Sequence, residues 1–149
     1  MRVLKYLMVC SIILIAISCS TITIQPTNFA WPIESVLLTD EKGSVDEPRF
    51  SISFNATQLF VYEFGDSANV ASQELRIIRD TKGYYYVTAA NFKNVFIFNS
   101  DDGALKLEKK LLVSEKGLLS PAMNQRNPYI ELIDGENKYL LTNKGFERK

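Results

Sequence analysis

The chain has 149 residues, and its 17 basic side chains balance its 17 acidic side chains. This length suits one domain with its own hydrophobic core, and the even charge balance argues against nucleic acid as a partner. Histidine is absent from the sequence, which excludes Ser-His-Asp and Cys-His catalysis and histidine-ligated zinc and haem.

The amino-terminal segment has the pattern of a targeting sequence. Arg2 and Lys5 precede an apolar run from Tyr6 to Ile17. The run has about a dozen residues, fewer than the roughly 18 to 20 that cross a bilayer and typical of the core of a signal peptide. It ends in Ala-Ile-Ser-Cys at residues 16–19. These four residues resemble a bacterial lipobox, in which a small residue precedes the cysteine that becomes lipidated.

The resemblance implies three parts. Residues 1–18 are expected to be a signal peptide, residues 19–28 the lipidated Cys19 with a short tether, and residues 29–149 a single β domain. Acyl chains such as palmitate on Cys19 would make a membrane the first partner. Ser20, rather than Asp, favours the outer membrane if the cell has two membranes. The alternative is an ordinary signal-peptide cysteine with cleavage by a general signal peptidase.

The positions of the cysteines limit the chemistry of the remaining chain. Cys10 and Cys19 are the two cysteines of the sequence, and both lie in the targeting segment. The mature domain therefore has no structural disulfide, no thiolate metal site and no cysteine nucleophile.

The tether is short. When extended, residues 20–28 reach at most roughly 30 Å, so we expect the domain to stay close to its membrane. Their Thr/Ile alternation also fits a first strand, and Pro26 would place that strand at the edge of a sheet.

Beyond the tether, short runs of β-forming residues alternate with turn signals. The alternation in Arg49 to Phe54 places Phe50, Ile52 and Phe54 on one face of a strand. We further expect strands at residues 33–39 and 59–64, a turn at 40–43, and one helical turn within 66–72.

The centre of the sequence gives the clearest strand pattern. Residues 75–80 and 84–89 flank a Thr-Lys-Gly turn and predict a β-hairpin. Residues 95–98 are all apolar, which indicates a strand covered on both faces.

Two structures fit residues 104–113. They follow an Asp-Asp-Gly turn, and we expect them to form the second strand of a hairpin. However, Ala104, Leu107 and Leu111 also share one face of a helix.

The last part of the chain combines an irregular segment with a hairpin. Residues 118–128 are rich in Pro, Asn and Gln, and we expect them to form the longest irregular segment. Residues 129–133 and 138–142 flank an Asp-Gly-Glu-Asn turn and predict a closing hairpin. In total, about eight short strands favour an all-β fold: a single antiparallel sandwich or barrel-like domain.

Aromatic residues form the first group of candidate binding residues. Tyr84 and Tyr86 share one face of a strand and are candidates for stacking on a glycan, although cross-strand packing in the core is the favoured explanation. Trp31 is the only tryptophan. We expect it to anchor the amino-terminal segment to the core, with contact to a ligand or to the membrane interface as the alternative.

The irregular segment supplies the second group. Leu119, Met123 and Arg126 lie within it, and long loops that expose apolar residues on a rigid scaffold are common contact surfaces for proteins. Alternatively, its apolar residues fold back as a lid over an open end of the domain.

No motif predicts a cofactor, a metal site or an enzyme activity. Asp40, Glu41, Asp46 and Glu47 surround one turn, but they lack the EF-hand spacing, and we expect a solvated acidic loop. Paired carboxylates remain the one catalytic apparatus that the composition allows. We expect almost all acidic side chains to lie in turns or on polar faces, with ordinary pKa values.

The leading hypothesis is a non-catalytic envelope lipoprotein that contacts another envelope protein through a sheet edge or a loop. A second hypothesis is a glycan-binding surface lipoprotein that uses Trp31 and the tyrosines. A carboxylate-based hydrolase is the third.

Overall fold

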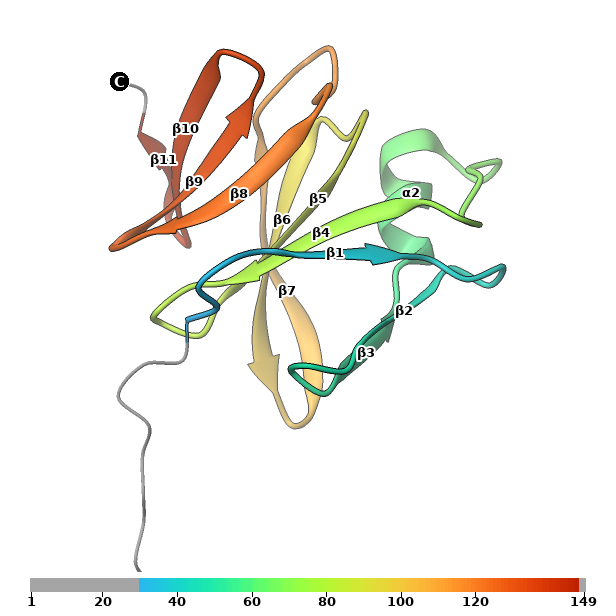
Figure 1. Cartoon of the computed structure of the whole chain (residues 1–149). Helices are drawn as coiled ribbons and strands as arrows, with labels where there is room; N and C mark the ends of the chain where they lie inside the picture. The colour runs from blue at the N-terminus through green and yellow to red at the C-terminus, as the bar shows by residue number, and fades with distance from the viewer. Residues whose placement is uncertain (1–29, 148–149) are drawn as a thin grey trace, which may run out of the picture.

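The computed structural model describes residues 30–147, and within this range the fold is mostly antiparallel β-sheet with a single helix (Figure 1). The predicted signal peptide, Cys19 and the tether lie outside the described residues. The prediction of an all-β sandwich-like domain is confirmed, with eleven strands instead of about eight. The elements are β1 Ser35–Leu38, β2 Ser44–Glu47, β3 Ile52–Asn55, α2 Thr57–Phe64, β4 Glu74–Arg79, β5 Tyr85–Ala89, β6 Asn94–Asp101, β7 Ala104–Leu112, β8 Pro121–Arg126, β9 Tyr129–Asp134, β10 Asn137–Thr142 and β11 Gly145–Glu147.

The central layer is a five-stranded sheet in the order β1-β4-β5-β6-β7. Its β4–β5 hairpin confirms the prediction for the centre of the sequence. The Asp80 carboxylate fixes the turn of this hairpin, because its Oδ1 accepts the backbone N–H groups of Lys82 at 2.8 Å and Tyr84 at 2.9 Å. Residues close in sequence thus fix the β4–β5 hairpin at the centre of the sheet. On one side of this hairpin β1 pairs with β4, and on the other side β6 pairs with β5.

A four-stranded sheet in the order β11-β10-β9-β8 forms the second layer. It includes the predicted closing hairpin β9–β10. An isolated bridge between Ile33 and Asn124 links β8 to the chain that leads into β1. The two sheets share one core, in which all of the following side chains are fully buried: Ile78, Tyr86 and Ile97 from the first sheet, and Met123, Ile130 and Leu132 from the second.

The β2–β3 hairpin and α2 cover part of the other face of the central sheet (Figure 1). Aromatic rings join α2 to this sheet: the ring centroids of Phe60 and Phe92 are 5.1 Å apart, and those of Tyr62 and Phe96 are 5.6 Å apart. Val95, Phe96 and Ile97 are buried, as expected for a strand covered on both sides. Phe98 is only partly buried.

The prediction of a strand at residues 59–64 is wrong, because this segment belongs to α2. Its Phe, Val and Tyr residues favour strands intrinsically, but tertiary contacts override that preference. Leu59 and Phe60 turn to the core. The Glu63 carboxylate accepts the backbone N–H groups of Lys93 at 2.9 Å and Asn94 at 3.2 Å, which fixes the helix against the loop before β6.

The other ambiguous segments are also resolved. Residues 104–113 contain β7, which pairs with β6 along its whole length, so the strand prediction is confirmed and the helix alternative is wrong. Residues 66–72 form turns and no helix.

The segment 118–128 is not an irregular loop, because most of it is β8. Pro121 is the first residue of this edge strand, where its missing N–H removes no required ladder bond. Met123 pairs across the ladder with Leu132. The alternation of buried and exposed residues is therefore that of an ordinary strand, although Asn, Gln and Arg hide it in the sequence.

Candidate functional site: a slot between β3 and β7

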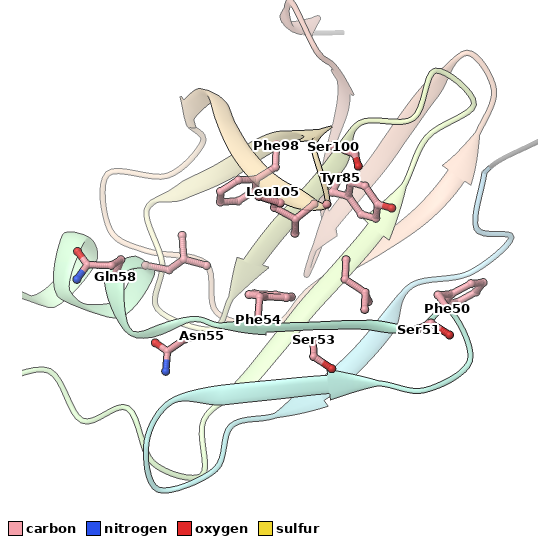
Figure 2. A pocket seen from close by; sticks show the side chains of 14 residues that line it. Phe50, Ser51, Ser53, Phe54, Asn55, Gln58, Tyr85, Phe98, Ser100 and Leu105 are labelled. Atoms are coloured by element: carbon pink, nitrogen blue, oxygen red, sulfur yellow. The ribbon is translucent and has the colours of Figure 1, made fainter.

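A cavity of about 530 Å³ lies between the β2–β3 hairpin and the β6–β7 end of the central sheet (Figure 2). Its lining is made of short stretches from β3, α2, β5, β6 and β7. The lining residues are Phe50, Ser51, Ile52, Ser53, Phe54, Asn55, Gln58, Leu59, Tyr85, Phe98, Ser100, Gly103, Ala104 and Leu105. We call this cavity the β3–β7 slot.

The slot runs along the edge of β3 and over one face of the central sheet. On the sheet side it is lined by Tyr85, Phe98, Ser100 and Leu105, which share one face of β5, β6 and β7. On the other side, residues 50–55 line it without interruption. Successive side chains of a strand point to opposite faces, so an unbroken run of lining residues means that the cavity lies along the edge of the strand. Among the described residues, β3 pairs only with β2 and β7 only with β6.

The slot carries no charge of its own, because none of its lining residues is acidic or basic. Phe54, Phe98 and Leu105 supply apolar surface, and Figure 2 shows Phe98 and Leu105 on the side opposite Phe54. The polar lining residues are uncharged, and three of them are serines. Ser53 donates to the Asp46 carboxylate, and the Nδ2 group of Asn55 donates to the backbone oxygen of Lys42 at 2.8 Å.

One end of the slot is held by an aromatic cluster. The rings of Trp31 and Phe50 are stacked with centroids 4.0 Å apart, and Tyr85 meets Trp31 edge-on at 5.6 Å. The Trp31 backbone N–H donates to the oxygen of Arg79 at 3.0 Å. Because Trp31 is only 4% exposed, its predicted role as an anchor is confirmed, and its indole ring has little surface left for a ligand.

An ion pair fixes the bend that precedes β3. Arg49 donates to both oxygens of the Glu47 carboxylate, at 2.9 and 2.6 Å, and to Ser35 Oγ at 2.9 Å. The side-chain hydrogen bond from Arg49 is the largest influence on Glu47 and, with smaller contributions from Ser35 and the Arg49 backbone, it outweighs burial and lowers the pKa of Glu47 from 4.5 to about 2. The Arg49 guanidinium also lies over the ring of Phe50, 5.6 Å from its centroid. Two contacts thus hold Phe50: the stacked ring of Trp31 and the guanidinium of Arg49.

The two predicted tyrosines, Tyr84 and Tyr86, both pack against the core. Tyr86 is fully buried, and its hydroxyl donates to Asp80 Oδ2 at 2.9 Å. Burial, together with the charge of Asp80, raises the pKa of Tyr86. Tyr84 is partly buried against the core. Neither lines the slot, and the burial of Tyr86 agrees with the favoured explanation of packing in the core; Tyr85, on the opposite face of the strand, does line the slot.

The second predicted group is dispersed along and before β8. Leu119 is 81% exposed, whereas Met123 is fully buried, so Met123 is wrong as a contact residue. Arg126 pairs with the Glu131 carboxylate at 2.6 Å. Met123 and Arg126 lie in β8 of the second sheet, and Leu119 lies just before this strand. None of the three lines the slot.

Among residues 30–147, three acidic side chains are buried and are exceptions to the expected pattern of solvated carboxylates: Glu47, Asp80 and Asp134. Each accepts hydrogen bonds from the chain around it. Asp134 Oδ1, for example, accepts the backbone N–H groups of Leu119 at 2.9 Å and Ser120 at 2.7 Å. These carboxylates stabilise turns and bends.

A search of residues 30–147 finds no group of three acidic, cysteine or histidine side chains able to hold a metal ion. Within the same residues, no helix has the length and hydropathy to cross a membrane. The β3–β7 slot is the candidate functional site.

No protein-family model, no curated protein and no solved structure matches this chain.

Proposed function

We propose that this protein is a membrane-anchored, non-catalytic lipoprotein of the cell envelope that binds another envelope protein through the β3–β7 slot. The lipobox-like residues 16–19 support the anchor, and Ser20 favours the outer membrane in a cell with two membranes. The absence of histidine, and of cysteine beyond Cys19, supports a binding role over catalysis.

The observation that carries the proposal is the slot between the unpaired edge of β3 and one face of the central sheet. Proteins usually protect such edges with charged residues, bulges or a covering segment, because an open edge recruits other chains. Here β3 has no charged residue, and the groove beside it is apolar and neutral. An edge left open in this way is suited to a partner.

The short tether adds a restriction on that partner. Residues 20–28 reach at most roughly 30 Å, so the slot stays near the membrane surface. A protein of the same membrane, or one that approaches it closely, is the partner that this geometry favours.

The anchor is tested by comparing Cys19→Ala with Cys10→Ala, a matched control in the preceding segment. Cys19→Ala should release the protein from the membrane fraction, because the acyl chains are lost, whereas Cys10→Ala should leave it there. Intact-mass analysis of the wild type should find acyl groups on Cys19. An unmodified amino terminus at Ser20 or Thr21 would contradict the anchor.

The binding role is tested by co-purification from detergent-solubilised membranes. We expect one envelope protein to be retained by the wild type and by Leu119→Asp, an exposed position outside the slot, and lost with Leu105→Asp. Retention of that protein by Leu105→Asp would contradict the use of the slot.

A further inference from the structure

The open edge of β3 carries a defined set of backbone groups. In an antiparallel pair, residues that bond across the ladder alternate with residues that direct their N–H and C=O groups to the other side. The Ala56 N–H donates to the Gly43 oxygen at 2.8 Å, at the end of the β2–β3 ladder. Phe54 therefore bonds to β2, whereas Ser53 and Asn55 direct their N–H groups to the slot. Among residues 30–147, no acceptor receives these two N–H groups.

The amino-terminal sequence contains a segment that matches this edge. Residues 20–24 read Ser-Thr-Ile-Thr-Ile and precede the described residues. In a strand, this alternation places the two isoleucines on one face and the two threonines on the other. Residues 20–29 contain no charged side chain, so they can enter the neutral slot without removing a charge from water.

The path of the chain leads from the slot to this segment. Trp31 stacks on Phe50, which lines the slot just before β3 begins. Residues 25–29 reach at most roughly 17 Å when extended, which is enough to connect Trp31 to a strand beside β3. Such a strand would end where β3 begins, so it would run antiparallel to β3.

We propose, resting on the proposed function, that residues 20–24 add to the open edge of β3 as a third strand of the β2–β3 hairpin, and that they close the slot until the partner protein displaces them. A covering segment is a common protection for an open strand edge, which otherwise recruits other chains. Displacement would also free residues 20–28 to their full reach of roughly 30 Å. Capture of the partner would thereby let the domain move away from the membrane.

The open backbone groups fix the register of the added strand. Thr23 lies opposite Ser53 and exchanges two backbone hydrogen bonds with it, and Thr21 lies opposite Asn55 two positions further along. The threonine side chains then share the outer, exposed face with Ser53 and Asn55. The two isoleucines face the floor of the slot, where Tyr85 and other side chains of the central sheet supply apolar surface.

The experiment is hydrogen exchange of the full lipidated protein in detergent micelles, measured by mass spectrometry with fragmentation that assigns single amides. In the wild type, we expect the amides of Ser53 and Asn55 to exchange about tenfold or more slower than in Thr23→Pro. Proline has no N–H, so this variant loses a hydrogen bond in the middle of the added strand.

Two lysine variants distinguish the faces of the segment. Ile22→Lys places a charge against the apolar floor and should remove the protection, whereas Thr23→Lys places the same charge on the exposed face and should keep it. Both leave Cys19 and Ser20 unchanged, so both should stay in the membrane fraction. In co-purification, Ile22→Lys should retain more of the envelope protein than the wild type, because the competing segment is weakened.

Fast exchange of Ser53 and Asn55 in the wild type, or equal protection in Thr23→Pro, would overturn the added strand. Native mass spectrometry gives the number of copies in each micelle. Protection in a monomer supports pairing within one chain, and protection found only in a dimer would overturn it by assigning the strand to a second copy. Cys19→Ala and Leu105→Asp test the proposed function without these variants, so the binding lipoprotein can stand if the added strand fails.

Discussion

Trp31 stacks on Phe50 with ring planes only 9° apart, which joins the start of the described chain to the end of the slot. Residue 31 precedes the central sheet, and residue 50 precedes β3. Through this contact, the β2–β3 hairpin is held by the segment that precedes β1 as well as by its own strands. The width of the slot at this end depends on the Trp31–Phe50 stack, because Phe50 lines the slot.

Removal of the buried partner of this pair should destabilise the fold strongly. We expect Trp31→Ala to lower the free energy of unfolding by about 3–5 kcal/mol, because a large aromatic side chain is lost from the core. Phe50→Ala should have a smaller effect, because this ring is 39% exposed. Urea unfolding followed by far-UV circular dichroism measures both, and equal effects would contradict the difference in burial.

The two phenylalanines of β6 should also differ. Phe96 is 1% exposed, and Phe96→Ala should lower the free energy of unfolding by about 3–5 kcal/mol. Phe98 is partly open to the slot, and Phe98→Ala should lower it by about 2 kcal/mol. Chemical denaturation distinguishes the two values, and a larger effect at Phe98 would mean that the slot is closed in solution.

Leu119 and Met123 provide a test of the second sheet. Met123→Ser should lower the free energy of unfolding by about 3 kcal/mol or more, because it leaves a cavity and buries a hydroxyl. Leu119→Ser should change it by less than about 0.5 kcal/mol, because the leucine is 81% exposed. Thermal melting measures both changes. Similar melting temperatures for the two variants would show that β8 does not pack as described.

The Glu47–Arg49 pair should give an acid-dependent contribution to stability. The pKa of Glu47 is lowered from 4.5 to about 2 in the folded protein, so the ionised form stabilises the fold above about pH 4.5. That contribution is lost as the pH falls toward 2. We therefore expect Glu47→Gln to be less stable than the wild type at neutral pH.

The stability difference between Glu47→Gln and the wild type should shrink between pH 4.5 and about 2, the range between the ordinary and the lowered pKa of Glu47. Denaturation curves at a series of pH values measure it. A difference that stays constant across this range would show that Glu47 acts through packing alone.

Local patterns in the sequence were sufficient to predict the hairpins. Residues 75–89 combine β-forming residues with a Thr-Lys-Gly turn, and the structure forms β4 and β5 there. Contacts distant in sequence decided the segments that were predicted wrongly. Glu63 fixes α2 through the backbone of residues 93 and 94, and β8 gains its pairing from β9, against the weak strand propensity of its polar residues.

The slot could not be predicted from the sequence, because it depends on which strands do not pair. The alternation in residues 49–54 predicts a strand, and the structure forms β3 at Ile52–Asn55 with residues 49–51 in a turn, but the alternation does not reveal that β3 leaves a slot over the central sheet. Tyr85 was missed for a related reason. Its two tyrosine neighbours lie on the other face of the strand. The strand pattern alone does not tell which of the two faces borders a cavity, so it does not identify Tyr85 as a lining residue.

The most direct test of the account is site-specific photo-crosslinking in intact cells. A photoreactive amino acid at Ala104, on the wall of the slot, is compared with one at the exposed Leu119. We expect crosslinks from residue 104 to map, by mass spectrometry, to one contiguous segment of a single envelope protein, and to disappear with Leu105→Asp. Crosslinks to the same protein from both positions, or crosslinks from residue 104 that persist with Leu105→Asp, would contradict binding in the slot.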